Sequence, residues 1–252
     1  MGEAVVDVAR VAPGVHWHAL EDDVVVGRGH ALHRPDGRVF VSVDTWRDDV
    51  FEVLAEAMVR DLPPPVYTVV DEDDREVLAR WSSRRFVDHR YEADYVVPTD
   101  ADPPPPPGAV VLAASEVGER RLRELDRRLR AEIERTVGWS GLPAQLLPPP
   151  GAGGPFDASQ YLVVVHDGED AGLLRLAPLP RRPRLGLVAV RAAHRRRGLA
   201  RALLGESFRG LRARGVGTVQ AEVDEANEPA KRLLVALGAT RAGGAVELVR
   251  GR

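Results

Sequence analysis

The order of apolar and polar positions predicts two series of alternating strands and helices. In the first series, residues 38–44 alternate as a strand, and Thr45 with Asp48 forms a capping box that opens a helix. The apolar residues of that helix share one face, which is typical of a helix packed on a core. The expected elements of this series are strand 38–44, the helix with Val50, Leu54 and Met58, strand 66–70, helix 74–85 and strand 91–97.

The second series begins with a charged helix whose apolar stripe is Leu122, Leu125, Leu129 and Ile133. Residues 161–176 read as a hairpin that turns at Asp167-Gly168. Glycines after two of the later helices predict where those helices end. The remaining expected elements are strand 185–190, helix 200–214, strand 218–223, helix 229–237 and strand 246–249.

The same element order therefore occurs twice, and part of the repeat extends to the residues themselves. V-D-E-D-D at 70–74 matches V-D-E-A-N at 223–227 with an offset of 153. The preceding strands, 41–43 and 188–190, align with an offset of 147, so the second copy has six extra residues between strand and helix. The alternative is a chance recurrence of V-D-E-x-[DN] in a chain rich in Asp and Glu.

A proline-rich segment separates the two series. Residues 98–108, PTDADPPPPPG, favour a stiff extended conformation that neither a helix nor a central strand contains. The sequence therefore predicts a domain at 1–97, a linker at 98–108 and a second domain at 109–252.

Composition narrows the class of protein. Of 252 residues, 44% are hydrophobic and 29% charged, which excludes a disordered or collagen-like chain. The absence of cysteine excludes a disulfide scaffold, a thiolate metal site and a cysteine nucleophile. The N-terminal residues lack the pattern of a secretory signal, and no apolar run is long enough to span a bilayer, so we expect a cytoplasmic protein with no membrane partner.

Charge is unevenly distributed along the chain. Residues 1–100 hold 11 Arg and Lys against 21 Asp and Glu, whereas the remainder has an excess of basic residues. The basic part could hold an anionic ligand and the acidic part could attract a cationic one, although such charge also keeps proteins soluble. No zinc-finger spacing or aromatic-interleaved basic stripe occurs, and His16, His18, His30 and His33 complete no ligand pattern, so neither a nucleic-acid partner nor a metal is expected.

The extra residues of the second copy lie in the loop 191–200, RAAHRRRGLA, between a strand and a helix. Gly198 permits a tight turn, and the first turn of the helix leaves N–H groups without helical partners at its positive end. Arg195, Arg196 and Arg197 add donors suited to a diphosphate. The alternative is a solvated basic loop with a glycine turn.

This loop resembles the pyrophosphate loop [Q/R]-x-x-G-x-[G/A] of the GCN5-related N-acetyltransferase (GNAT) superfamily, which Arg195-x-x-Gly198-x-Ala200 fits. The strand 188–190 precedes it, and Asn227 and Gly238 follow in the pattern N-x10-G. The resemblance covers about residues 110–252 and extends to residues 1–97 through the repeat. It implies an α/β (α+β) fold of two GNAT-like domains, each a mixed, mostly antiparallel sheet flanked by helices.

The resemblance also implies a cofactor and its ligands in the second domain. The strand 188–190 would pair its backbone with the pantetheine arm of acetyl-coenzyme A, the amides of residues 196–201 would cradle the pyrophosphate, and Asn227 would contact the cofactor arm. Asn227 is equally suited to cap the following helix. The expected cofactor-binding residues are Val188, Ala189, Val190, Arg195, Arg196, Arg197, Gly198, Leu199, Ala200, Arg201 and Asn227. The first domain is expected to be degenerate, because no glycine-rich loop follows Val43 and Trp81 matches Leu234.

Acetyl transfer to an amine requires a base, since an alkyl ammonium ion has no lone pair with which to attack a thioester. Along residues 218–224 polar and apolar positions alternate, which places Glu222 on the polar face as the candidate base. Its position five residues before Asn227 resembles that in members that acetylate a ribosomal-protein N-terminus. The alternative is a structural glutamate paired with an arginine. Leu234 replaces the tyrosine that many members use as general acid, and Arg184 replaces a second glutamate.

The sequence thus indicates an N-acetyltransferase that moves an acetyl group from acetyl-coenzyme A to an amine of a small molecule or peptide. Direct attack in a ternary complex is expected, because no cysteine is present to form an acyl-enzyme. Two alternatives stay open: a catalytically silent acyl-coenzyme A sensor or scaffold, and an interaction protein with no cofactor. The sequence does not indicate the acceptor or the oligomeric state.

Overall fold

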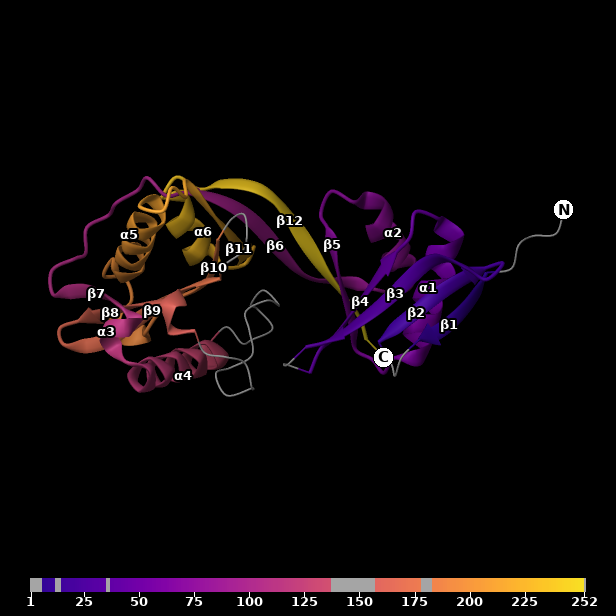
Figure 1. The fold of residues 1–252 in the computed structure, drawn as a ribbon, viewed down its shortest axis with the longest axis horizontal. Helices are drawn as coiled ribbons and strands as arrows, with labels where there is room; N and C mark the ends of the chain where they lie inside the picture. Colours follow the sequence, from indigo (N-terminus) through magenta and orange to yellow (C-terminus); the bar gives the residue numbers. More distant parts are fainter. Residues whose placement is uncertain (1–5, 12–14, 35–36, 137–156, 178–182, 252) are drawn as a thin grey trace. The chain divides into compact units, whose positions relative to one another are not determined.

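The computed structural model describes residues 6–11, 15–34, 37–136, 157–177 and 183–251. Contacts divide the chain into two compact units: an N-terminal unit of residues 1–91 and 244–252, and a C-terminal unit of residues 92–243. Strands β6 (Val87–Pro98) and β12 (Thr240–Arg250) each contribute residues to both units (Figure 1).

The N-terminal unit is a sheet with two helices. Its strands lie in the order β1-β2-β3-β4-β5-β12, and every described pair is antiparallel except β4 with β5, which is parallel. The elements not yet given are β1 (Asp7–Val11), β2 (His16–Glu21), β3 (Val24–His33), β4 (Val39–Asp44), α1 (Asp48–Asp61), β5 (Val66–Asp71) and α2 (Arg75–Ser83).

Helix α1 packs its predicted apolar face into the core of this unit. Val50, Leu54 and Met58 have no exposed surface, and a Cβ at Gly29 of β3 would lie 2.4 Å from the sulfur of Met58. Glycine at this position thus gives the helix room to approach the sheet. The predicted capping box is wrong: the helix has Arg47 as N-cap with no side-chain bond, because the Thr45 hydroxyl accepts from the Arg47 amide at 3.2 Å.

The C-terminal unit has helices on both faces of a mixed sheet. Its strands lie in the order β6-β11-β10-β9-β8-β7, with β10 and β11 parallel and the other described pairs antiparallel. One hydrophobic core joins the sheet to α5, and another joins it to α4. The elements are β7 (Ala109–Ala113), α3 (Ala114–Val117), α4 (Glu119–Thr136), β8 (Tyr161–His166), β9 (Glu169–Ala177), β10 (Arg184–Val190), α5 (Leu199–Arg212), β11 (Thr218–Asp224) and α6 (Glu228–Val235), with 3₁₀ turns at Ala158–Gln160 and Ala192–His194.

The internal repeat is visible in the element order and in the hydrogen bonds that side chains accept from backbone amides. The series β4-α1-β5-α2-β6 matches β10-α5-β11-α6-β12. Asp74 and Asn227 cap α2 and α6 in the same way, each accepting from the amide three residues on, at 3.0 and 3.2 Å. Asp71 and Asp224 likewise accept from the amide two residues on. The aligned V-D-E-x-[DN] segments therefore form the same strand end and helix start in both copies.

The two copies exchange their last strands. Residues 92–98 of β6 pair with β11, and residues 245–250 of β12 pair with β5. Glu247 holds β12 in the N-terminal unit, because its buried carboxylate accepts from Arg38 at 2.9 Å and Arg90 at 3.1 Å. Each compact unit is thus completed by the strand that ends the other copy.

The compact units divide between residues 91 and 92 and between residues 243 and 244. The segment after β6 belongs to the C-terminal unit and packs along α5. The Thr99 hydroxyl donates to the carbonyl of Val216 at 2.8 Å, Asp102 pairs with Arg209 at 2.7 Å, and Pro103 contacts Gly205. Residues 99–108 therefore cover a helix of one unit, a role that their proline-rich composition did not indicate.

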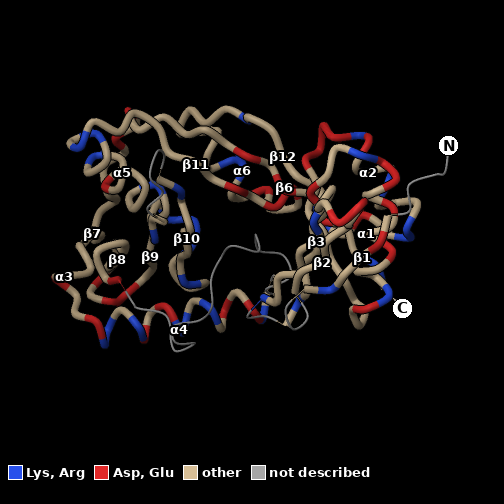
Figure 2. Tube along the Cα trace, turned by 45° about the vertical axis from the view of Figure 1, so that its right-hand side comes forward, with Lys and Arg blue, Asp and Glu red and all other residues tan. Residues whose placement is uncertain are grey.

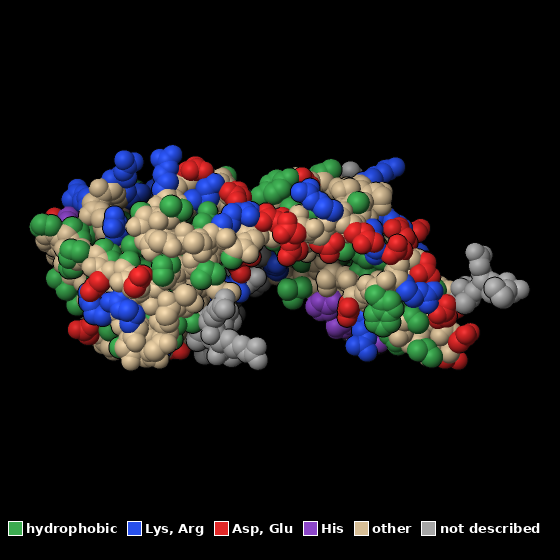
Figure 3. All heavy atoms as spheres, turned by 90° about the horizontal axis from the view of Figure 1, so that it is seen from above, with side chains coloured by type: hydrophobic (Ala, Val, Ile, Leu, Met, Phe, Trp, Pro, Cys, Tyr) green, Lys and Arg blue, Asp and Glu red, His purple; other side chains and the backbone are tan. Residues whose placement is uncertain are grey.

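The charge bias predicted from the sequence is visible on the surface. Figure 2 shows acidic and basic residues alternating along α4. On the face drawn in Figure 3, basic side chains gather on the C-terminal unit and acidic ones on the N-terminal unit. Within the described ranges, no helix is long and apolar enough to cross a membrane, and no three His, Asp or Glu side chains form a group that could hold a metal ion.

Candidate functional site

The site begins where strands β10 and β11 separate. Their parallel ladder joins Arg184 to Gln220 and Leu185 to Ala221. At Gly186 the register of β10 against β9 shifts, and beyond that point β10 continues along β9 alone. The divergence leaves a gap in the sheet with one strand edge on each side.

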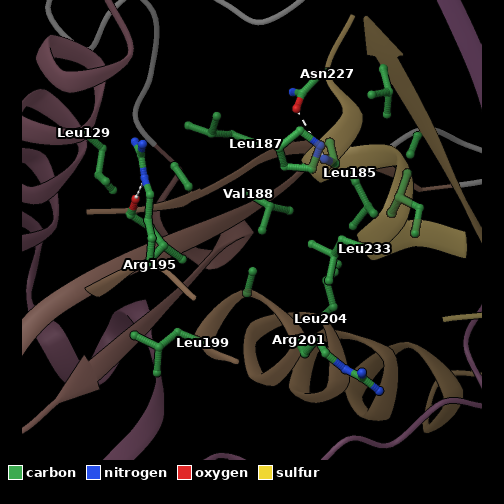
Figure 4. A pocket seen from close by; sticks show the side chains of 18 of the residues that line it. Leu129, Leu185, Leu187, Val188, Arg195, Leu199, Arg201, Leu204, Asn227 and Leu233 are labelled. Carbon is green, nitrogen blue, oxygen red and sulfur yellow. Dashed lines mark hydrogen bonds between the residues drawn. The ribbon is translucent and has the colours of Figure 1, made fainter. Parts of the chain in front are cut away.

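A cavity of about 760 Å³ lies in this gap. Its volume is within the range of small-molecule and cofactor sites. Figure 4 shows apolar side chains directed into it from several elements, among them Leu187, Val188 and Leu233. The cavity is lined by Leu129 and Ile133 of α4, residues 185–190 of β10, His194 to Arg196 and Gly198 of the loop, residues 199–201 and 204 of α5, residues 221–224 of β11, and Asn227, Pro229, Ala230, Leu233 and Leu234 at α6.

The edge of β10 presents two peptide groups to the cavity. The Arg191 amide donates to Ala171 of β9 at 2.8 Å, and peptide groups along a strand alternate between its two sides. The amide and carbonyl groups of Val188 and Val190 therefore point away from β9 and into the gap. Those of Ala189 point toward β9. The carbonyl of Val190 accepts from Arg195 Nε at 3.1 Å, as the dashed line in Figure 4 shows.

The loop after β10 ends in a helix start with no side-chain cap. Arg196 and Gly198 have φ angles of 66° and 82°, so the chain turns sharply before α5 begins at Leu199. Because Gly198 is the N-cap, no side chain of that residue covers the amides of the first turn. Exposed arginines 195, 196, 197 and 201 surround this positive helix end. The arrangement suits an anion with several oxygens.

Polar contacts from α4 and β9 hold the loop in place. His194 is 8% exposed, and its Nε2 lies 3.2 Å from Glu169 Oε2. The Ala192 amide donates to Glu132 of α4 at 2.8 Å, and Arg191 donates to the carbonyl of Asp170 at 3.2 Å. These contacts were not predicted from the sequence. Nothing in the sequence joins Glu132 to a loop 60 residues away.

Strand β11 has the predicted alternation. Val219, Ala221 and Val223 are buried, and the alternate polar residues are partly exposed. Glu222 lines the cavity on this polar side, and Asn227 lines it just beyond the end of the strand. The amide oxygen of Asn227 accepts from Ala230 (Figure 4), so its predicted role as a helix cap is confirmed.

Glu222 is paired with an arginine, as the alternative interpretation expected. Its Oε1 lies 2.7 Å from a guanidinium nitrogen of Arg184 on β10. The two side chains are 19% and 20% exposed, so both are accessible from solvent. On the other side of β11, the strand register places Asp94 opposite Glu222 and Glu92 opposite Asp224.

The groups beside Asn227 keep their charges at neutral pH. Hydrogen bonds to Glu225 and Glu228 raise the pKa of Lys231 above its usual range. The hydrogen bond from Lys231 lowers the pKa of Glu228. Neither group is therefore suited to proton transfer near pH 7. Leu234 is 4% exposed, and none of the described residues that line the cavity is Tyr, Ser, Thr, Cys or Lys.

The matching region of the N-terminal unit is filled. The hydroxyl of Thr68 on β5 donates to the carbonyl of Val41 on β4 at 2.8 Å. Trp81, at the position of Leu234, packs edge-on against Phe51 and Phe86 with ring centroids 5.1 and 4.7 Å away. Val69 stands at the position of Glu222. Trp81, Phe51 and Phe86 belong to the hydrophobic core of this unit.

Comparisons with known proteins agree with this geometry. Residues 139–239 match the model of the acetyltransferase (GNAT) family. No match was found among curated proteins. A GCN5-related N-acetyltransferase from Sphaerobacter thermophilus is 19% identical with a TM-score of 0.68, over 94% of this chain and 81% of its own.

Two further solved structures share the fold. A tandem GNAT protein from the clavulanic acid biosynthesis pathway is 17% identical with a TM-score of 0.61, over 94% of this chain and 82% of its own. A GCN5-related N-acetyltransferase from Kribbella flavida is 12% identical with a TM-score of 0.63, over 96% and 89%. The family match of residues 139–239 supports acyl transfer in general. Residues 139–239 therefore match the acetyltransferase (GNAT) family, and the solved structures show that the N-terminal half is GNAT-like in its fold.

Proposed function

We propose that the C-terminal unit transfers an acetyl group from acetyl-coenzyme A to an amine by direct attack in a ternary complex. The observation that carries this proposal is the cavity between β10 and β11, which connects an uncapped, arginine-rich helix start with the carboxylate of Glu222. This reaction requires a site that binds the anionic cofactor at one end of the cavity and a proton acceptor at the other.

The cofactor would use the features already described. Val188 and Val190 would exchange backbone hydrogen bonds with the pantetheine arm, which would take the place of a neighbouring strand. Ala189 would form part of the cavity wall. The backbone amides of residues 196–201 would hold the diphosphate together with Arg195. Leu199 and Ala200 would therefore contribute only their backbone amides. Asn227 would contact the arm with the amide nitrogen that capping leaves available.

Glu222 would act as the base. Its carboxylate takes a proton from the bound ammonium group, and the neutral nitrogen then attacks the thioester carbon. The carbon–nitrogen bond forms as the carbon–sulfur bond breaks, and the thiolate leaves with the electron pair. Because the described cavity wall offers no tyrosine at the position of Leu234, we infer that the second proton, which leaves the nitrogen as the amide forms, reaches the thiolate through water.

A second function is favoured by two features of the site. The pair between Arg184 and Glu222 engages the proposed base, and Leu234 lines the cavity where a tyrosine would protonate the thiolate. Both features suit a catalytically silent module that binds an acyl-coenzyme A and acts as a sensor or scaffold. Such a module would bind the cofactor and turn over no amine.

Calorimetric titration of the full chain with acetyl-coenzyme A and with free coenzyme A tests the proposal. We expect micromolar binding of both, followed by amine-dependent release of free thiol. Binding without thiol release over a broad panel of amines would support the silent module. No binding of either compound would contradict both functions and leave an interaction protein with no cofactor.

Variants of Asn227 and Asp74 distinguish the role of Asn227 as a helix cap from its expected contact with the cofactor. Because both side chains cap a helix in the same way, Asn227→Ala and Asp74→Ala should each lower the free energy of unfolding by about 1 kcal/mol. We expect only Asn227→Ala to weaken acetyl-coenzyme A binding as well. Thermal unfolding and calorimetry measure the two effects, and equal affinities in both variants would limit Asn227 to capping.

A further inference from the structure

The short turn that follows β10 is bonded to two other elements. It is a 3₁₀ turn from Ala192 to His194, and its N-cap, Arg191, makes no side-chain cap bond. The carboxylate of Glu132 on α4 takes that place, because its Oε2 accepts from the Ala192 amide at 2.8 Å. At the other end of the turn, His194 Nε2 lies 3.2 Å from Glu169 Oε2 on β9. Both ends of the turn are therefore held by side chains from outside the loop.

The turn leads directly into the residues at which an anion is expected. Arg195, Arg196 and Gly198 follow it and line the cavity, and α5 then begins with no side-chain cap over its first amides. Helix α4 is a firm anchor for this segment, because its apolar stripe is buried in a core shared with β8, β9 and β10. A displacement of the turn would also displace the start of α5, since the two are nearly contiguous in the chain.

The charge of Glu132 is opposite to the charge that an anion site requires. The loop offers arginines 195, 196 and 197 to the expected diphosphate, whereas a nearby carboxylate repels it. Glu132 is also not among the described residues that line the cavity. Any favourable contribution of this side chain to cofactor binding must therefore come from its bond to the Ala192 amide.

We propose that Glu132 is a positioning residue for the cofactor, which holds the loop in the conformation that presents the first amides of α5 to the diphosphate. This inference rests on the proposed acetyl transfer. Ordering a loop costs conformational entropy, and a loop that is ordered before the ligand arrives removes that cost from binding. The bond should therefore act on the affinity for the cofactor and leave kcat nearly unchanged.

Two substitutions of equal charge and similar length isolate the bond. Glutamine and methionine both remove the carboxylate and have similar helix propensities, but only glutamine keeps an oxygen that can accept from the Ala192 amide. We expect Glu132→Met to bind acetyl-coenzyme A about 3- to 10-fold more weakly than Glu132→Gln in calorimetry, the effect of one hydrogen bond. Glu124→Met and Glu124→Gln, which change an exposed side chain of the same helix, should bind it equally. Equal affinities of the two Glu132 variants would overturn the inference.

The choice of acyl donor separates positioning from a merely structural role. S-acetylpantetheine carries the thioester arm without the diphosphate, so its kcat/KM should be nearly the same in Glu132→Met and Glu132→Gln. With acetyl-coenzyme A, Glu132→Met should have the higher KM and an almost equal kcat. A decrease of the same size with both donors would mean that Glu132 supports the fold in general, and would overturn the inference.

The donor side of the bond gives an independent test. Ala192→Pro removes the amide N–H, and the preceding residue, Arg191, has an extended backbone with ψ of 141°, which a following proline favours. In this background Glu132→Met and Glu132→Gln should bind acetyl-coenzyme A equally, because neither can form the bond. A persistent difference would show that Glu132 acts by another route and would overturn the inference. Absence of acetyl-coenzyme A binding by the wild type would instead contradict the proposed function itself.

Discussion

Glu222→Gln is expected to lower kcat for amine acetylation by about 100- to 10,000-fold, the range over which general bases contribute. Glutamine has the shape of glutamate and can still accept a hydrogen bond from Arg184, but it cannot take a proton from an ammonium ion. The affinity for acetyl-coenzyme A should stay close to that of the wild type, because the diphosphate is expected at the far end of the cavity. Steady-state kinetics and calorimetry separate the two effects.

The pH dependence distinguishes a base from a structural partner of Arg184. An alkyl ammonium group loses its proton in solution near pH 10, so the defect of Glu222→Gln should shrink as the pH rises toward that value. Glu124→Gln, which changes an exposed glutamate in the pair with Arg128, should leave the profile unaltered. A Glu222→Gln enzyme as active as the wild type at neutral pH would show that Glu222 serves only to hold Arg184.

Local patterns in the sequence predicted most individual elements. The alternation in β11 placed Val219, Ala221 and Val223 in the core, and the structure confirms it. The repeated V-D-E-x-[DN] segment predicted two equivalent helix starts, because the cap bond joins residues only three apart. Thr45 shows the limit of such patterns. The predicted capping box requires its hydroxyl to accept from the Asp48 amide, but the hydroxyl accepts from the Arg47 amide instead.

Pairing between distant strands could not be predicted in this way. Alternation along β6 and β12 identifies strands but carries no information on their partners, so the sequence did not predict the exchange of last strands. The candidate site has the same limit. The motif located the loop and Glu222, whereas the ion pair with Arg184 depends on how β10 and β11 are aligned. Leu129 and Ile133 were predicted to lie on the apolar face of a helix, but the cavity that they line followed only from the position of α4.

Reversing the charges of Arg196 and Arg197 should remove acetyl-coenzyme A binding. Both side chains are exposed, and the chain between β10 and α5 turns through them, so the substitution should leave the fold intact. Each arginine lost from a diphosphate is worth about 1.5–3 kcal/mol, and the new carboxylates repel the same anion. We therefore expect Arg196→Glu with Arg197→Glu to weaken binding by at least about 100-fold in calorimetry.

A second double variant controls for the change in net charge. Arg120→Glu with Arg127→Glu alters two exposed arginines of α4 and changes the charge of the C-terminal unit by the same amount. It should bind acetyl-coenzyme A nearly as the wild type does, because exposed charges beyond about 10 Å are screened at moderate salt. Added salt should weaken binding by the wild type and by this control, because the loop arginines are present in both. Wild-type affinity in the Arg196 and Arg197 double variant would mean that the helix amides suffice for the diphosphate or that the anion binds elsewhere.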